Sequence, residues 1–143
     1  MTREIPDDLH NKIVEKTESG NVLCEAARFE EALEEYRHAL NLLPEPFEDW
    51  EASSWILGAI GDCHFLLGAF EAARHFFQSS LLCAGGMDEP FYHLRWGQSE
   101  FELGNMEPAK QELARAYMLG GATIFAGHDP KYISFLREFM RAT

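Results

Sequence analysis

Apolar residues return every three or four positions along most of the chain, with polar and charged residues between them. In the stretch 29–42, Phe29, Leu33 and Tyr36 fall on one side of a helix, and four glutamates fall on the other side. This spacing, with proline and glycine signals between the runs, predicts an all-α chain of seven helices. The predicted ranges are 8–27, 29–42, 50–67, 69–82, 90–103, 106–118 and 130–141.

A repeated arrangement of small and bulky residues divides the chain into three parts. Each part has a glycine (Gly20, Gly61 or Gly97), a glycine or alanine seven positions later and an alanine five positions after that. A bulky apolar residue then follows after four positions and a small residue after three more. Small residues let two helices approach closely, but one helical hairpin cannot bury its apolar stripe alone. We therefore expect three stacked hairpins, at about 8–44, 50–86 and 90–121.

This pattern resembles the tetratricopeptide repeat, a helix-turn-helix unit of about 34 residues with the signature W-x2-L-G-x2-Y, A-x3-F and P. The resemblance rests on the agreement of the three units with one another, over about four-fifths of the chain. Some signature positions differ. Leu23, His64 and Glu100 replace the tyrosine, and only the first unit ends in the expected proline, Pro44.

The resemblance implies that the whole chain, residues 1–143, forms one domain. The fold would be a right-handed superhelix of three tetratricopeptide units with a C-terminal capping helix. That last helix, at 130–141, is expected to begin with Asp129 as N-cap and Pro130 at its first position. Its apolar side chains would cover the open end of the third unit.

The first unit is longer than the others. The glycines are separated by 41 and then 36 residues, which leaves about seven extra residues in the first interval. They form the loop 43–49, in which Pro44 and Pro46 end the preceding helix and favour an extended backbone, and Asp49 is the expected N-cap of the next helix. We predict that the segment 44–51 is a contact surface for a partner, formed by Glu45, Phe47, Glu48, Asp49 and Trp50.

A second predicted contact surface comes from the resemblance. In the repeat family the first helix of each unit lines a groove that takes a peptide or protein element. Carried onto this sequence, the predicted groove residues are Asn21, Trp55, Asp62, Phe65, Phe91, Arg95, Gln98 and Phe101. The carboxylate clamp of heat-shock co-chaperones needs several basic and amide residues, and only Asn21 and Arg95 stand at comparable sites, so recognition of an acidic C-terminal tail is not expected. For Trp55 and Phe65, packing in the core is an equal alternative.

The formal net charge of −12 is unevenly distributed along the chain. Residues 1–51 carry 14 acidic and 5 basic side chains, whereas residues 52–143 carry 10 acidic and 7 basic ones. Such a charge disfavours nucleic acid and anionic membranes as partners and would speed association with a basic protein.

The sequence offers no catalytic, cofactor or metal site. The three cysteines form no CxxC pair, so we interpret them as buried apolar residues. The glutamates at 30, 31, 34 and 35 have no histidine beside them, so we interpret them as a solvated helix face. Phosphate-loop, GxSxG, HExxH and EF-hand motifs are missing, and we predict that the chain is not an enzyme. Without a signal-peptide pattern or a long apolar run, it is expected in the cytosol.

The predicted function is protein–protein interaction. The stretches LPEPFEDWEASSWILGAIGDCHFLLGAFEAA, PFYHLRWGQSEFELGN and HDPKYISFL resemble small stand-alone bacterial tetratricopeptide-repeat proteins, some of which are encoded beside secreted toxins. That resemblance implies an immunity protein that binds and neutralises a basic secreted toxin. The alternatives are a secretion-type chaperone or adaptor for effector proteins and a regulatory subunit of an enzyme. Apolar surface on the first and last units would also allow a homo-oligomer.

Overall fold

The computed structural model describes residues 4–142 of the chain, so residues 1–3 and 143 of the expected 1–143 domain lie outside the described part. Within the described residues the secondary structure consists of seven α-helices and two short 3-10 helices, η1 (Phe47–Asp49) and η2 (Ala122–Phe125). The α-helices are α1 (Asp7–Glu25), α2 (Phe29–Asn41), α3 (Glu51–Leu66), α4 (Phe70–Leu81), α5 (Pro90–Glu102), α6 (Met106–Gly120) and α7 (Pro130–Ala142). The predicted all-α fold is confirmed.

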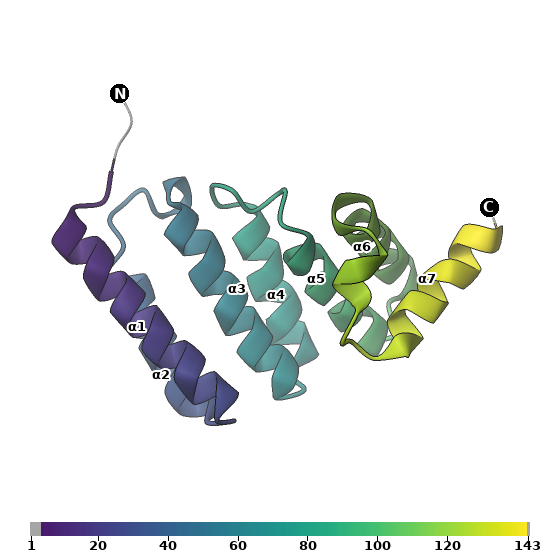
Figure 1. The fold of residues 1–143 in the computed structure, drawn as a ribbon, viewed down its shortest axis with the longest axis horizontal. Coiled ribbons are helices and arrows are strands. Elements are labelled where there is room, and N and C mark those ends of the chain that lie inside the picture. The colour runs from purple at the N-terminus through teal and green to yellow at the C-terminus, as the bar shows by residue number, and fades with distance from the viewer. Residues whose placement is uncertain (1–3, 143) are drawn as a thin grey trace.

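The helices pack as three hairpins, α1 with α2, α3 with α4, and α5 with α6. Each hairpin also packs on the next one, through α2 against α3 and through α4 against α5. Figure 1 shows the hairpins in a row, with α1 at one end and α7 at the other. This is the stacked arrangement that the three sequence units predict.

The repeated glycines let the two helices of each hairpin touch. A Cβ atom on Gly20 would lie 2.5 Å from Cε1 of Tyr36, and one on Gly97 would lie 2.8 Å from Cδ2 of Leu113. The corresponding atom on Gly61 would lie 3.0 Å from the ring of Phe77. In every unit the glycine of the first helix therefore faces the bulky residue of the second helix, as the shared spacing predicts.

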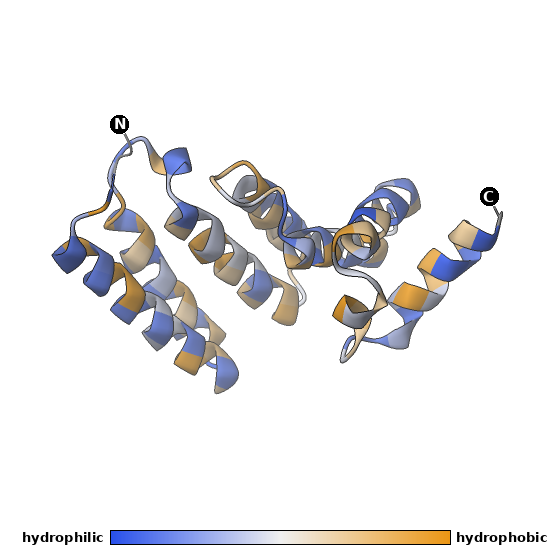
Figure 2. Cartoon of the chain, turned by 45° about the horizontal axis from the view of Figure 1, so that its top comes forward, coloured by the Kyte–Doolittle hydropathy of each residue, from blue (hydrophilic) through white to orange (hydrophobic). Residues whose placement is uncertain are grey.

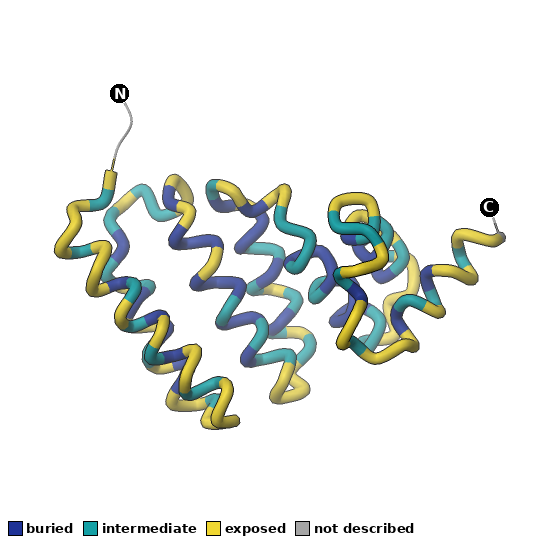
Figure 3. Tube along the Cα trace, viewed as in Figure 1, coloured by how far each residue is buried: buried dark blue, intermediate teal, exposed yellow. Residues whose placement is uncertain are grey.

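The middle of the row is the most deeply buried part of the described chain. α3 is more apolar than α1 or α2 (Figure 2), and most of its residues are buried (Figure 3). Ile13, Tyr36 and Ile56 belong to one core cluster that joins the first hairpin to α3. Phe77 and Tyr92 belong to a second cluster, which joins α4 to α5. The stripes that a single hairpin leaves open are thus buried between neighbours. No helix among residues 4–142 is long and apolar enough to cross a membrane.

The start of α3 differs from the prediction. We expect Asp49 as the N-cap, but it lies in η1. Trp50, whose backbone is extended, directly precedes α3. The N-cap prediction is therefore wrong. The Oγ atom of Ser53 instead donates to the carbonyl of Phe47 at 2.6 Å, and the backbone N–H of Ser53 donates to the carbonyl of Trp50 at 3.1 Å. These bonds join the short 3-10 turn to the first turn of α3.

The C-terminal part follows the predicted start signal. Oδ1 of Asp129 accepts a hydrogen bond from the backbone N–H of Lys131 at 3.0 Å, and Pro130 is the first residue of α7. α7 packs on α6 and η2, and Leu136 and Tyr132 are buried there with Leu113. The last helix therefore covers apolar side chains of the third hairpin, which is the role predicted for it.

Candidate functional site

A groove of about 500 Å³ lies between α1, α3 and the start of α5. Asn21, Trp55, Asp62 and Phe91 are predicted groove residues, and all four line it. The other four predicted groove residues, Phe65, Arg95, Gln98 and Phe101, lie outside this hollow. The hollow is thus lined by residues of the first helices of all three units.

Two tyrosines form part of the groove wall because glycines make room for them. A Cβ atom on Gly58 would lie 2.4 Å from Cε1 of Tyr92, so that ring fits only against a position without a side chain. Gly20 makes the same room for Tyr36, whose hydroxyl donates to Oδ1 of Asn21 at 2.6 Å. Burial raises the pKa of both phenols, so both stay protonated.

An ion pair joins the second unit to the third. Nε of Arg95 on α5 donates to Oδ1 of Asp62 on α3 at 2.8 Å. The guanidinium carbon lies 4.2 Å from the centre of the Phe65 ring and 5.5 Å from the centre of the Phe91 ring. Three predicted groove residues therefore surround Arg95, and its charge is matched by Asp62.

Gln98 does not present a contact surface to a partner, because its side chain is fully buried. Its Oε1 atom accepts from Nη1 of Arg95 at 2.9 Å, and its Nε2 atom donates to Nδ1 of His128 at 3.0 Å. Nδ1 of His128 therefore carries no proton in this arrangement, and burial, with the nearby Arg95 charge, lowers the pKa of that imidazole. Gln98 holds Arg95 from the inside rather than contacting a ligand.

Phe101 is partly covered by the C-terminal helix. Its ring makes edge-to-face contacts with Tyr132 and Phe135 of α7, at centroid distances of 5.4 and 5.1 Å. The hydroxyl of Tyr132 also donates to Oε1 of Glu102 at 2.6 Å, and Nζ of Lys131 lies 2.6 Å from the same oxygen. The predicted contact surface therefore extends no further than the third unit, where α7 covers it.

Trp55 is a surface residue, with 36% of its side chain exposed. Besides the groove, it lines two smaller hollows of about 280 and 250 Å³, which extend toward the α4–α5 loop and toward the N-terminal segment. Phe65 is half-buried and makes an edge contact with the ring of Phe70. The two aromatic residues therefore differ: Trp55 faces the hollows, and Phe65 packs partly inside.

The inserted loop folds back onto the protein. Trp50 is buried, and its Nε1 atom donates to the carbonyl of Pro44 at 2.6 Å. The carbonyl of Glu48 accepts from the backbone N–H of Ala84 at 2.9 Å, which ties the loop to the α4–α5 connection. Phe47 is half-buried against the core, whereas the side chains of Glu45, Glu48 and Asp49 are exposed. A partner at this loop would therefore meet mainly carboxylates.

The groove carries negative charge. Glu25, Asp62 and Glu89 line it, and no lysine or arginine among the described residues does so. Cys24 also lines it, and its sulfur lies 3.5 Å from that of Cys63. Burial raises the pKa of both thiols, so they stay protonated and unreactive as nucleophiles. Within residues 4–142 no group of three or more His, Cys, Asp or Glu side chains is placed to hold a metal ion.

Comparison with known families adds to this geometry. A family model described as tetratricopeptide repeat matches residues 15–81, which contain most of α1 and all of α2 to α4. Just under half of the chain is therefore similar to tetratricopeptide repeats. The third hairpin, beyond that match, repeats the same contact between a glycine and a bulky residue at Gly97 and Leu113.

Several solved structures share the fold at low sequence identity. The type III secretion chaperone SycD of Yersinia enterocolitica, in complex with a peptide of the translocator YopD, is 16% identical with a TM-score of 0.72, and 98% of each chain is covered. PcrH from Pseudomonas aeruginosa is 16% identical, with a TM-score of 0.71 over 96% of each chain. The first repeat domain of Spaghetti (RPAP3), bound to the HSP90 peptide SRMEEVD, is 18% identical with a TM-score of 0.69, covering 92% of this chain and 95% of that one. The comparison with curated protein sequences gave no match.

Several residues at the candidate site were not predicted from the sequence. Glu25, Glu89 and Tyr92 line the groove, and His128 supports Arg95 through Gln98. Glu25 follows Asn21 by four positions, which is one helical turn, so its place was open to prediction from spacing. His128 follows Gln98 by 30 positions, and no local pattern joins two residues so far apart.

Proposed function

We propose that the chain is a non-enzymatic chaperone or adaptor, which holds an extended segment of a partner protein in the groove between α1, α3 and α5. The observation that carries this proposal is the open groove with the exposed ring of Trp55 beside it. Tryptophan is enriched among the residues that dominate binding energy at protein interfaces. A hollow of about 500 Å³ has room for a few side chains of such a segment.

The charges of the groove favour a partner segment that carries lysine or arginine beside apolar residues. Glu25 is exposed at the groove, whereas Arg95 on α5 is already paired with Asp62. An acidic segment would meet carboxylates, which are repulsive toward it, and among the described residues no lysine or arginine lines the hollow to attract it. A basic segment would gain complementary charge, and its apolar side chains would pack against Trp55 and Phe91.

The similar structures support the chaperone or adaptor interpretation better than the immunity interpretation. SycD was solved with a peptide of the translocator YopD, and PcrH with the chaperone-binding region of PopB. The immunity interpretation rests on the net charge of −12, which would suit a basic toxin, and none of the structures reported above concerns a toxin. The regulatory-subunit alternative has no specific observation in its favour.

Two exposed glutamates allow a matched test of the groove. Glu25 lines the groove on α1, whereas Glu30 is exposed near the start of α2 and lines none of the hollows described above. The tagged chain is purified from cells that normally make it, and the affinity of the co-purified protein is measured by calorimetry. We expect Glu25→Lys to weaken binding about fivefold or more and Glu30→Lys to leave it unchanged.

The identity of the co-purified protein separates the functional classes. Several secreted or membrane-inserting proteins would support a chaperone, and a single toxin neutralised at equal molar ratio would support immunity instead. Equal weakening by both charge reversals would show that the groove is not the binding surface. Chemical turnover by the purified chain alone would overturn the non-enzymatic function.

A further inference from the structure

A second hollow of about 390 Å³ lies at the junction of α4, the α4–α5 loop, α5 and α6. No residue lines both this hollow and the groove. We call it the Trp96 pocket, and the residues used below are Leu82, Met87, His93, Trp96 and Arg115. Leu82 is 78% exposed and Met87 is 63% exposed, although both are large apolar side chains. An apolar surface of this kind often marks an interaction site.

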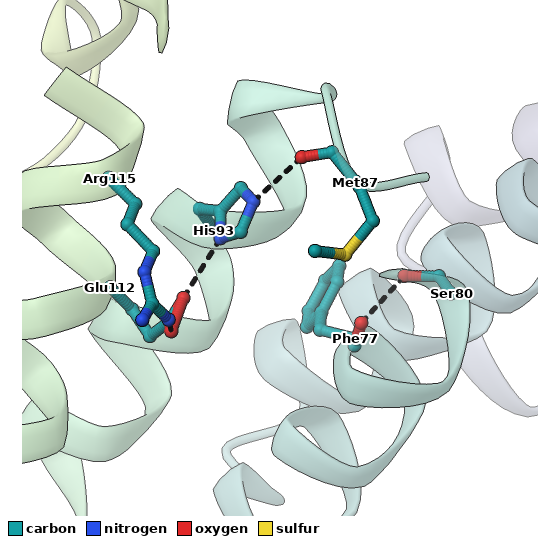
Figure 4. Close-up of polar contacts among 6 residues, drawn as sticks. All are labelled: Phe77, Ser80, Met87, His93, Glu112 and Arg115. Carbon is teal, nitrogen blue, oxygen red and sulfur yellow. Dashed lines mark hydrogen bonds and ion pairs between the residues drawn. The ribbon is translucent and has the colours of Figure 1, made fainter. Parts of the chain in front are cut away.

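A charged network forms the polar side of the pocket (Figure 4). His93 is buried, its Nδ1 atom lies 2.9 Å from Oε2 of Glu112, and its Nε2 atom lies 3.0 Å from the carbonyl oxygen of Met87. A carboxylate and a carbonyl both accept hydrogen bonds, so both ring nitrogens must donate for both bonds to form. The two contacts therefore favour the imidazolium form of His93, and the hydrogen bond with Glu112 raises its pKa.

Arg115 adds a second positive charge to the same carboxylate. Its guanidinium contacts Oε1 of Glu112, and its side chain is 55% exposed. Two cations thus share one anion, and the pocket has an excess of positive charge in a chain whose net charge is −12. Asp88 is exposed on the neighbouring loop but does not line the pocket.

Trp96 also contributes an unused donor. Its indole N–H is covered from solvent and has no hydrogen-bond acceptor among the described residues. A covered donor without an acceptor is unfavourable, so the Trp96 side of the pocket carries an uncompensated cost. Arginine, tryptophan and tyrosine are the residue types most enriched in interface hot spots, and the pocket contains two of these types, in Arg115 and Trp96.

We propose that the Trp96 pocket docks a partner protein through an apolar side chain that stands next to a carboxylate. The apolar side chain packs against Leu82, Met87 and Trp96, and the carboxylate binds the exposed guanidinium of Arg115. The site is independent of the groove function. Its preference for an acidic segment is opposite to that of the groove, so one chain would bind two chemically different segments.

Nuclear magnetic resonance of the intact protein tests this proposal, because the chain has three indole N–H groups, on Trp50, Trp55 and Trp96. The probe is a blocked pentapeptide with one leucine between two aspartates, and its matched control has two asparagines. We expect the aspartate peptide to shift the Trp96 indole resonance, assigned with Trp96→Phe, in a saturable way at up to about 5 mM. The asparagine peptide should bind about fivefold more weakly, which is the size of one exposed ion pair.

Two variants, each shown by circular dichroism to keep the native fold, test which side chains of the pocket bind the peptide. Arg115→Gln should bind the aspartate peptide as weakly as the asparagine peptide, and Leu82→Ser should weaken both peptides. Leu66→Ser, at an exposed leucine outside the pocket, should change neither affinity. Equal affinity for the two peptides, a shift confined to Trp55, or no shift at all would overturn the proposal. So would self-association of the chain that Leu82→Ser abolishes, because the occupant would then be a second copy.

Discussion

Asp62 on α3 and Arg95 on α5 form an ion pair with a distance of 2.8 Å between Oδ1 and Nε. The two side chains are only 27% and 14% exposed, and Arg95 also bonds to Gln98 and lies over the ring of Phe65. The pair therefore joins the second repeat to the third and keeps the arginine from pairing with an acidic ligand.

A double-mutant cycle with Asp62→Asn and Arg95→Gln measures how much this pair contributes to stability. We expect a coupling free energy of about 1 kcal/mol in urea unfolding, because the pair is partly shielded from water and geometrically restrained. The pair of Arg28 and Glu31, with side chains 58% and 54% exposed, is the control and should couple by about 0.3 kcal/mol. Equal coupling in both cycles would show that the partly buried pair has no special role.

The glycine contacts predict different effects of the same substitution in two repeats. A Cβ on Gly97 meets Leu113 at 2.8 Å and also its backbone nitrogen at 2.9 Å, whereas a Cβ on Gly61 meets only the ring of Phe77, at 3.0 Å or more. Backbone gives way less easily than a ring. Gly97→Ala should therefore lower the free energy of unfolding by about 1–3 kcal/mol.

In Gly61→Ala the new contact is milder. Alanine stabilises a helix by about 1 kcal/mol relative to glycine, which offsets most of the destabilisation from that contact. Chemical denaturation of both variants gives the comparison. A Gly61→Ala variant less stable than Gly97→Ala would contradict the contact geometry.

Ala27 is the one described residue other than glycine with a left-handed backbone, at φ 60°. The same position of the other repeats is occupied by Gly68 and Gly104, with φ of 79° and 82°. Ala27→Gly should relieve about 1–2 kcal/mol of backbone strain in the folded state. It should also cost about 0.4–1 kcal/mol of stability, because glycine gives the unfolded chain more conformational freedom. We expect a net gain of roughly 0.5–1 kcal/mol in thermal or urea unfolding. Ala26→Gly, at φ −83°, is the control and should destabilise the protein; a similar loss in both variants would contradict the strain.

Much of the fold could be predicted because its causes are local. Helical spacing located all seven α-helices, and the repeat of glycine and bulky positions predicted which residues touch within each hairpin. The interval of 41 residues between Gly20 and Gly61 also located the inserted loop. How the loop folds could not be predicted, because it depends on the bond between Glu48 and Ala84, which are 36 positions apart in the sequence.

His93 makes stability depend on pH in a predictable direction. The groups that face it are Glu112 and Arg115 from α6 and the carbonyl of Met87 from the loop. The contact with Glu112 raises the pKa of His93 above its usual value of about 6.5. The stabilisation is therefore fully present below about pH 6.5 and is lost as the pH rises through the higher pKa of the folded state.

The measurement is the stability difference between the natural chain and His93→Gln as a function of pH. We expect the difference to be largest near pH 6 and to shrink as the pH rises toward 9. In a Glu112→Gln background the difference should lose this slope. A difference that grows with pH would mean that His93 is neutral in the fold.

The candidate site could be predicted only in part. Asn21, Trp55, Asp62 and Phe91, which the family resemblance implied as groove residues, all line one hollow. The burial of Gln98 could not be foreseen, because it results from a turn 30 residues later that brings His128 onto it. The cover over Phe101 has the same origin, in the packing of α7.

The central claim is that a partner segment lies in the groove, and site-specific photo-crosslinking in living cells tests it directly. The same benzophenone amino acid is placed at Glu25, in the groove, and at Glu30, outside it. We expect a crosslinked partner at position 25, lost in the Trp55→Ala background, and none at position 30. Mass spectrometry should locate the adduct in a segment with basic and apolar residues. Equal crosslinking at both positions, or crosslinking at position 30 alone, would contradict the account.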